Sequence, residues 1–379
     1  MTDHVIQDPA RRERAREYAR IRRRLFLVEL ALSGGALLLL IVSGAAVLLR
    51  DAVQSLSGTY HAQVALYTAV VALGASILFF PLSYYAGFVL PHRYGLSVQT
   101  TRGWIADHIK GTLIGLVQAI VVALPVYTLL RQAPQSWWLW AAVILTLFAI
   151  LLTNLAPILI VPLFFKLTPL ADADLRRRLL ALGDRAGARI TGVFVMDMSR
   201  RTRTANAALM GIGNTRRIVL GDTLWQRFAP EEIEAILAHE LGHHVHGDLS
   251  RGIALQTVLT FGALWAADRV LGAVTGPESP LAVHAPSDPA SLPILLLVAG
   301  VLFTILMPLT NGLSRRWEAA ADRFAVRVTG NAEAWKGALR KLADQNLAEV
   351  DPPRWVEWLL YSHPSIRHRL EAASRQPPP

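Results

Sequence analysis

The chain of 379 residues contains no cysteine. This absence excludes disulfide bonds, metal sites built on thiolates and the attachment of a lipid to a thiol of the chain itself. Charged residues are also scarce, at 17% of the sequence, and lysine supplies only four of the 38 basic residues. Because soluble domains carry about 25% charged residues, the low share argues against an ordinary soluble protein. The excess of arginine over lysine is typical of a GC-rich bacterial genome rather than of a function.

Apolar residues, in contrast, make up 53% of the sequence and gather in long runs. A run of about twenty apolar residues is long enough to cross a bilayer as a helix. We expect six such spans, with a seventh also possible, at residues 25–49, 63–90, 111–130, 137–164, 254–274 and 292–312. The lipid bilayer is therefore an expected partner of the chain.

The distribution of basic residues predicts the orientation in the membrane. Residues 1–24 contain eight arginines and the segment 165–253 is rich in arginine, whereas residues 51–62, 132–136 and 275–291 contain no lysine or arginine. We expect the N-terminus, the segment 165–253 and the C-terminus to face the cytoplasm, in a bacterial inner membrane. Since topology explains the basic N-terminus, no nucleic-acid partner is expected.

Two histidines four residues apart form the most informative motif, His239-Glu240-Leu241-Gly242-His243. Residues at this spacing share one face of a helix, so both imidazoles can bind one metal ion. Glu240 lies about 100° around the helix, where a carboxylate can take a proton from water and later give it to a leaving amine. The proline and two glutamates at 230–232 are typical of a first helical turn. The motif predicts a zinc peptidase site on a helix.

A catalytic zinc site needs a third protein ligand and leaves a fourth position for water. Without cysteine, this ligand must be His, Glu or Asp. His244 and His246 are close in sequence, but the metzincin pattern of a further Gly and His is missing. About 75 residues downstream, Glu318 and Asp322 stand four apart on an alanine-rich helical segment. Glu318 is the better candidate ligand and Asp322 a candidate partner of a ligand histidine. The alternative is a solvated helix face whose acids pair with nearby arginines.

Three ordered motifs resemble the integral-membrane zinc endopeptidases that include the type I CAAX prenyl protease. They are the His239–His243 motif, the segment 314–325 around Glu318 and Asp322, and Tyr361-Ser362-His363-Pro364. The similarity covers most of residues 90–370. The resemblance implies that His239, His243 and Glu318 bind one zinc ion per chain, that Glu240 is the general base and acid, and that Asp322 supports the metal site.

The same resemblance assigns residues to the substrate. It implies that Asn206 and Ala207 hold the substrate backbone on an edge strand, that His363 acts on the oxyanion side of the cut, and that Arg369 can pair with a substrate carboxylate. We expect strands at 189–197, 205–210 and 217–220, with a turn at 211–214. An extended peptide can add to such an edge through backbone hydrogen bonds whatever its side chains.

These patterns predict a predominantly α-helical integral membrane protein with a zincin-like α+β catalytic domain. The expected parts are a basic cytoplasmic segment (1–24), a membrane domain of about four spans (25–164), the first part of the catalytic domain (165–253), two further spans (254–312) and the second part of the catalytic domain with the third zinc ligand (313–379). The proteases resembled here have seven helices around a large chamber, so this chain is expected to lack one.

The expected function is hydrolysis of peptide bonds in a peptide or protein substrate, and the resemblance implies removal of the C-terminal tripeptide of a prenylated substrate. The nearest alternative is a quality-control protease of the same broad family that cuts damaged membrane proteins. Site-2-type proteolysis fits less well, because its motif lies inside a span and uses a distant aspartate. A catalytically silent membrane scaffold is a further alternative, which purified protein without zinc would favour.

Overall fold

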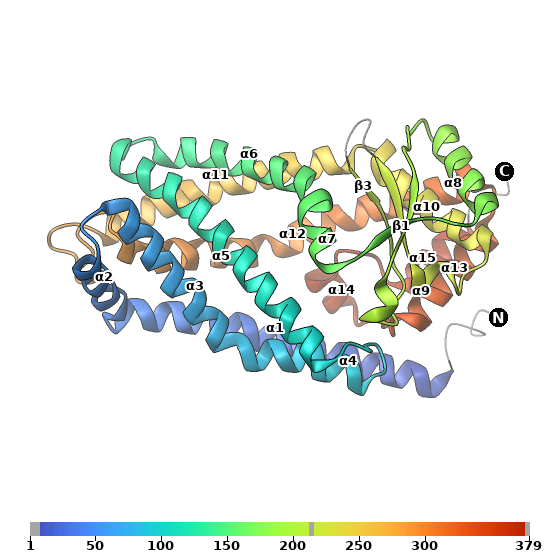
Figure 1. Cartoon of the computed structure of the whole chain (residues 1–379), viewed down its shortest axis with the longest axis horizontal. Coiled ribbons are helices and arrows are strands. Elements are labelled where there is room, and N and C mark those ends of the chain that lie inside the picture. The colour runs from blue at the N-terminus through green and yellow to red at the C-terminus, as the bar shows by residue number, and fades with distance from the viewer. Residues whose placement is uncertain (1–7, 212–215, 376–379) are drawn as a thin grey trace.

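The computed structural model describes residues 8–211 and 216–375. A bundle of long helices makes up one part of the molecule, and a compact α+β unit lies at one end of that bundle (Figure 1). The first residues of helix α1 and the C-terminal helix α15 lie at this same end. The described parts of both ends of the chain are therefore on one side of the helical bundle.

Six helices in the described part of the chain are long and apolar enough to cross a membrane. They are α1 (Pro9–Val42), the continuous run α3 (Tyr60–Tyr84), η1 (Tyr85–Val89) and α4 (Leu90–Arg93), then α5 (Thr101–Gln132), the run α6 (Trp137–Leu155), η2 (Ala156–Ile160) and α7 (Val161–Phe164), then α11 (Asp248–Val274) and α12 (Leu292–Thr329). The η1 and η2 segments are π-helical, and Pro157 lies within η2. The expectation of a predominantly helical membrane protein with six spans is confirmed.

The first span ends earlier than the expected range 25–49. Helix α1 stops at Val42, and Gly44 takes a left-handed conformation with φ 75° before α2 (Ala45–Leu56) begins. At 1.5 Å per residue, the 12 residues of α2 are too short to cross a bilayer. Gly44 therefore divides the predicted apolar run into a span and a short helix, although it does not interrupt the apolar pattern of the sequence.

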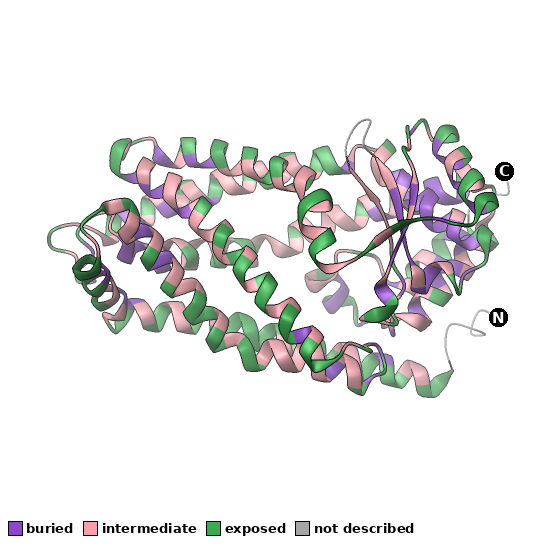
Figure 2. Ribbon diagram, in the orientation of Figure 1, coloured by how far each residue is buried: buried purple, intermediate pink, exposed green. Residues whose placement is uncertain are grey.

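The outer surface of the helical bundle carries large apolar side chains. Leu39 is 65% exposed, Val258 68% and Ile77 75%. Buried residues concentrate instead in the α+β unit, whereas the long helices are mostly exposed or half-buried (Figure 2). Because each Å² of exposed apolar surface costs about 25 cal/mol in water, the bundle requires lipid around it. An apolar cavity of about 820 Å³ lies between the helices, lined in part by α1, α3, α5, α11 and α12.

A four-stranded sheet forms the centre of the α+β unit. Its strands are β1 (Leu167–Pro169), β2 (Val193–Met196), β3 (Ala207–Met210) and β4 (Arg217–Gly221), in the order β1-β2-β4-β3. Strand β2 is parallel to β4, and the two outer strands are antiparallel to their neighbours. The three expected strands are present. Strand β2 is shorter than expected at both ends, β3 begins two residues later than expected, and β4 begins at the expected residue and continues one residue further. Residues 212–214 of the expected turn at 211–214 lie outside the described residues.

Shorter helices surround this sheet. They are α8 (Ala173–Arg185), η3 (Met198–Arg200), α9 (Asp222–Trp225), α10 (Pro230–Val245), α13 (Ala332–Gln345), α14 (Arg354–Leu360) and α15 (Ile366–Ser374), while η5 (Pro289–Ser291) precedes α12. One apolar core joins the sheet to α8, α10, α12 and α13, and its members include Leu182, Ile218, Ile233, Phe324 and Trp335. This core holds α10 against both the sheet and the end of α12.

The connection between α10 and α12 positions the functional residues. Only His246 and Gly247 separate α10 from α11, which leads into the helical bundle. Helix α12 then returns through the bundle and continues without a break into the α+β unit as far as Thr329 (Figure 1). The last part of α12 packs on α10. Segments about 75 residues apart in sequence thereby meet at one place.

Candidate metal centre

Helix α10 is stabilised at its start by its own sequence. Pro230 occupies the first turn, and the carboxylate of Glu232 accepts a hydrogen bond of 2.8 Å from the backbone N–H of Ala229. Ile233, Leu237 and Leu241 on this helix are at most 1% exposed. Since these apolar side chains are fixed in the core, the rotation of α10 about its axis is fixed, and with it the direction of both histidines.

Three side chains from two helices converge at the contact between α10 and α12. Nε2 of His239 lies 3.2 Å from Nε2 of His243. The carboxylate of Glu318 lies 3.4 Å from the first of these nitrogens and 3.3 Å from the second. In the described part of the chain, these three residues form the group whose ligand atoms all lie within 4.8 Å of one another. One metal ion can contact all three.

Gly242 permits this close approach of the two helices. A Cβ atom at Gly242 would lie 3.0 Å from Cα of Ala321 and 3.2 Å from Cβ of Phe324, both on α12. Any larger residue would push α12 away, and Glu318 stands one turn before Ala321 on that helix. The glycine between the two histidines therefore brings the third candidate ligand within reach.

A carboxylate lies at the other ring nitrogen of each histidine. Oδ1 of Asp322 lies 2.9 Å from Nδ1 of His239, and Oδ2 of Asp248 lies 2.9 Å from Nδ1 of His243. Burial lowers the pKa of both imidazoles, but nearby carboxylates outweigh it. Glu318 and then Asp248 raise the pKa of His243 to about 9, and Asp322 and Glu318 raise the pKa of His239. Nδ1 of His243 forms a hydrogen bond with Asp248, which leaves its Nε2 directed at the shared centre. Nδ1 of His239 lies at ion-pair distance from Asp322, and its Nε2 faces the same centre.

The donor set fits a divalent metal. Oε2 of Glu318 is buried and accepts no hydrogen bond from the described residues, although two cationic or imidazole nitrogens lie 3.4 and 3.8 Å away. A buried carboxylate oxygen without a hydrogen bond is costly. Two imidazole nitrogens and one carboxylate form a ligand set that zinc uses in peptidases, with one position left open. A cation among these three residues would satisfy the unpaired oxygen, so the site is consistent with metal binding.

Glu240 and His363 line the cavity beside this group. The cavity has a volume of about 790 Å³, and His239, Asn206 and Arg369 also contribute to its wall. Burial raises the pKa of the Glu240 carboxyl, while the two neighbouring imidazoles partly oppose that rise. Nε2 of His363 lies 3.1 Å from Oε1 of Glu318. The cavity thus places a carboxylate and an imidazole next to the candidate metal ligands.

Asn206 and Ala207 lie at the edge of the sheet. Strand β3 is one of the two edge strands of the sheet, and it pairs with β4 on one side, where Ala207 lies opposite Leu220. Ala205, the residue before Asn206, is held by the side chain of Asn346. This side chain accepts a hydrogen bond of 2.8 Å from Ala205 N and donates one of 3.1 Å to Ala205 O. Both Asn206 and Ala207 line the cavity. The free edge of β3 is therefore held next to the candidate metal ligands.

Arg369 faces Asp322 in the structure. It donates hydrogen bonds of 2.9 and 2.7 Å to the two carboxylate oxygens of Asp322, and its Nη2 lies 3.8 Å from Glu318. The guanidinium also lies 5.3 Å from the ring of Trp335, which in turn stacks on His239. Two donor groups of Arg369 are thus occupied by Asp322. The expected contact of Arg369 with a substrate carboxylate stays a prediction.

The site contains residues that the sequence reasoning did not identify. Asp248 is the first residue of α11, five residues after His243. An acidic residue so close to the metal motif is a sequence signal from which this partner of His243 could have been predicted. Tyr18, Arg22 and Phe26 of α1 form part of the cavity wall, for which no local pattern exists. His246 packs its ring on Phe324 at 5.7 Å instead of joining the metal group.

Comparison with protein families gives two adjoining matches. A family model described as "CAAX prenyl protease N-terminal, five membrane helices" matches residues 4–166, and the model of peptidase family M48 matches residues 169–376. The described part of the first region contains four candidate spans and the short helix α2. The second match contains the metal group and the cavity residues of the α+β unit.

Similar proteins come from bacteria, plants and fungi. "Uncharacterized metalloprotease YhfN" of Bacillus subtilis is 29% identical over 96% of this chain and 85% of its own length. "CAAX prenyl protease 1 homolog" of Arabidopsis thaliana is 31% identical over 81% of this chain and 72% of its own. "CAAX prenyl protease 1" of Saccharomyces cerevisiae is 29% identical over 82% and 72%. The solved structure of Ste24p from S. mikatae superimposes with a TM-score of 0.86, covering 97% of this chain and 89% of that one at 25% identity.

Proposed function

Because this chain belongs to peptidase family M48, we propose that it is an endopeptidase in which His239, His243 and Glu318 hold one zinc ion. Membership in the family makes it a membrane metallopeptidase that resembles the CAAX prenyl proteases. The single observation that supports the ion and its ligands most strongly is the convergence of two Nε2 atoms and one carboxylate within 4.8 Å. Nitrogen and carboxylate donors without cysteine suit catalytic zinc.

The residues around the metal group have separate roles in this proposal. A zinc ion bound there would polarise the carbonyl of the scissile peptide bond and lower the pKa of water. Glu240 accepts a proton from the attacking water and then donates it to the leaving amine. His363 donates a hydrogen bond to the oxyanion that develops on the carbonyl oxygen. Asp322 and Asp248 keep the two imidazoles oriented for metal binding.

The substrate in this proposal is a peptide that adds to the edge of β3. Ala207 lies on this edge and Asn206 directly before it, and the two hydrogen bonds between Asn346 and Ala205 make this part of the chain rigid. Backbone hydrogen bonds would align an extended peptide beside Glu240. Since relatives are named CAAX prenyl proteases, a protein with a prenylated C-terminus is the substrate class we propose.

We also propose an arrangement in the membrane. Residues 165–253 and 313–379 would form one catalytic domain facing the cytoplasm of a bacterial inner membrane, because the expected loops on the opposite side carry no lysine or arginine. The basic segment 1–24 would lie on the same cytoplasmic side. The shared core of α8, α10, α12 and α13 supports this division into membrane and catalytic parts.

Mass spectrometry of a farnesylated peptide with a C-terminal CAAX sequence tests this function. The protein purified in detergent should release the last three residues, while the same peptide without its lipid should be cut much more slowly. Cleavage of an unfolded membrane protein but of neither peptide would favour quality-control proteolysis instead. If a zinc-loaded preparation cuts none of these substrates, the peptidase proposal is wrong.

A further inference from the structure

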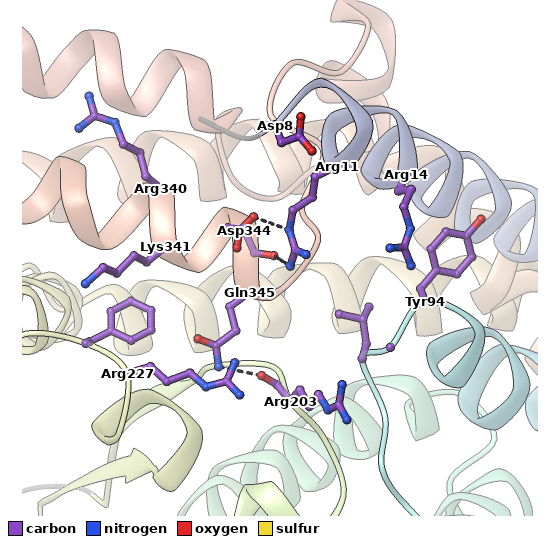
Figure 3. Close-up of a pocket in the computed structure, with 13 residues that line it drawn as sticks. Asp8, Arg11, Arg14, Tyr94, Arg203, Arg227, Arg340, Lys341, Asp344 and Gln345 are labelled. Carbon is purple, nitrogen blue, oxygen red and sulfur yellow. Dashed lines mark hydrogen bonds and ion pairs between the residues drawn. The ribbon is translucent and has the colours of Figure 1, made fainter. Parts of the chain in front are cut away.

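A second pocket lies outside the catalytic cavity, between the start of α1, the loop before α5 and helix α13. Its volume is about 860 Å³, which is within the range of small-molecule binding sites. Its wall is strongly basic and includes Arg11, Arg14, Arg203 and Arg227, while its carboxylates are Asp8 and Asp344 (Figure 3). The elements that form it come from distant parts of the sequence.

Three of these arginines form no ion pair with any described residue of the chain, although Asp8 lines the same pocket. Arg11 is paired, because it contacts the carboxylate of Asp344 and donates 2.6 Å to the backbone oxygen of the same residue. Among the described residues, the side chains of Arg14, Arg203 and Arg227 form no ion pair or hydrogen bond, and the guanidinium of Arg14 lies 5.9 Å from the centre of the Tyr94 ring. In Figure 3 these three side chains surround the open space of the pocket. The pocket therefore carries uncompensated positive charge.

The backbone at Arg203 is held by hydrogen bonds on both sides. Arg203 donates its N–H to Leu96 O at 2.9 Å, and its own carbonyl accepts 2.7 Å from the side chain of Gln345. Gln345 also donates 3.2 Å to Thr223 O, so α13 is tied to the first turn of α9. A frame of this kind reduces the entropy lost when an anion is bound.

The position of the pocket distinguishes between soluble and membrane ligands. Arg24 is the last basic residue before the apolar part of α1, and Arg11 and Arg14 precede it by 13 and 10 residues. At about 1.5 Å per residue, the pocket lies roughly 15–20 Å beyond the start of the apolar stretch. The headgroup layer on one side of a bilayer is only about 5–8 Å thick. The pocket is therefore too far from the membrane for lipid headgroups.

We propose that this basic pocket binds a soluble anion that carries two or more phosphate groups. A guanidinium forms paired hydrogen bonds with phosphate oxygens, and each phosphate ester carries a charge of about −1.5 to −2 at neutral pH. Two phosphates together carry a charge of about −3 to −4, which is enough to balance Arg14, Arg203 and Arg227. The apolar surfaces of Tyr94, Leu96 and Phe228 in the same pocket would contact the organic part of the ligand.

Isothermal titration calorimetry of the full chain in detergent tests this site. The probe is fructose 1,6-bisphosphate, a weak chelator, compared with fructose 6-phosphate and fructose. The bisphosphate should bind at least tenfold more tightly than the monophosphate, and the variant R14Q/R203Q/R227Q should weaken its binding at least tenfold. The matched control R176Q/R177Q/R185Q, which removes three exposed arginines of α8, should change affinity less than twofold.

Two further arms keep the test decisive. If the triple variant misfolds, the single variants R14Q and R227Q replace it, and each should weaken binding at least threefold. Soluble dihexanoyl phosphatidylglycerol serves as the lipid probe. Binding of this lipid in preference to the bisphosphate, equal losses in both triple variants, or no binding of any phosphate probe would each overturn the proposal.

Discussion

The carboxylate of Asp322 lies 2.9 Å from Nδ1 of His239, on the side of the ring opposite the group formed with His243 and Glu318. The same carboxylate accepts two hydrogen bonds from Arg369. One acidic residue therefore connects a candidate metal ligand to a buried arginine. In this position the carboxylate favours a proton on Nδ1 of His239 and leaves Nε2 facing the shared group.

The variant Asp322→Asn should weaken zinc binding about 10–100-fold, because the amide no longer favours the Nδ1–H tautomer of His239 and leaves Arg369 without its counter-charge. Competition with a zinc chelator of known affinity measures this change. Asp174→Asn on α8, an exposed residue paired with Arg177, is the matched control and should leave affinity unchanged. Equal affinities for Asp322→Asn and the native chain would contradict the assigned role.

Asp248→Asn should have a similar effect through the other histidine. Its Oδ2 lies 2.9 Å from Nδ1 of His243, so loss of the charge releases that ring. We expect zinc affinity to fall about 10–100-fold in the same chelator assay. Arg251→Gln removes the 3.4 Å partner of Asp248 without touching the histidine, and it should change affinity far less. If both variants behave alike, Asp248 does not act through His243.

Gly242→Ala should lower the midpoint of thermal unfolding in detergent. The new methyl group would lie 3.0 Å from Cα of Ala321, and overpacking of this kind costs roughly 1–3 kcal/mol. Gly300→Ala is the control on α12, since no atom lies within 4 Å of a Cβ built there. The control should leave the midpoint nearly unchanged. An unshifted midpoint for Gly242→Ala would show that α10 and α12 do not need this close contact.

Arg23→Gln should destabilise the contact between α1 and the catalytic part. Arg23 pairs with Glu349, whose side chain is only 5% exposed and which also accepts 3.0 Å from the hydroxyl of Tyr361. Loss of the arginine leaves a buried carboxylate unpaired, at a cost of up to about 3–5 kcal/mol. The lower unfolding midpoint should be partly restored in the double variant Arg23→Gln/Glu349→Gln.

Arg20→Gln, on an exposed position of α1, controls for the loss of positive charge alone. It should leave the unfolding midpoint unchanged. A double variant as unstable as the single Arg23 variant would show that the unpaired Glu349 carboxylate is not the cause.

Local patterns in the sequence predict a large part of this architecture. The apolar runs predict six spans, and the H-E-x-x-H spacing places His239 and His243 on one helix face. The residues that the patterns did not predict act across long distances in the chain. Arg23 and Glu349 are 326 residues apart, so no window of sequence contains both. The end of α1 at Val42 was missed for a different reason, because the conformation of Gly44 does not change the hydropathy of the run.

The position of Glu318 illustrates the same limit. The residues alone left a solvated helix face as an alternative, since an acid pair four apart is common on helices. The structure shows instead that α12 runs without a break from the bundle to α10 and that Gly242 brings the two helices together. Packing between distant segments decides which acidic residue reaches the histidines, and periodicity does not encode that packing.

The most direct test of the account compares Glu240→Gln with the native chain in one preparation, measuring zinc by mass spectrometry and cleavage of the farnesylated peptide together. Loss of the carboxylate removes the proposed base but none of the three proposed ligands. We predict about one zinc ion per chain in both proteins, with turnover reduced at least a hundredfold in the variant. Full turnover by the variant, or no bound metal in the native chain, would contradict the proposed metallopeptidase site.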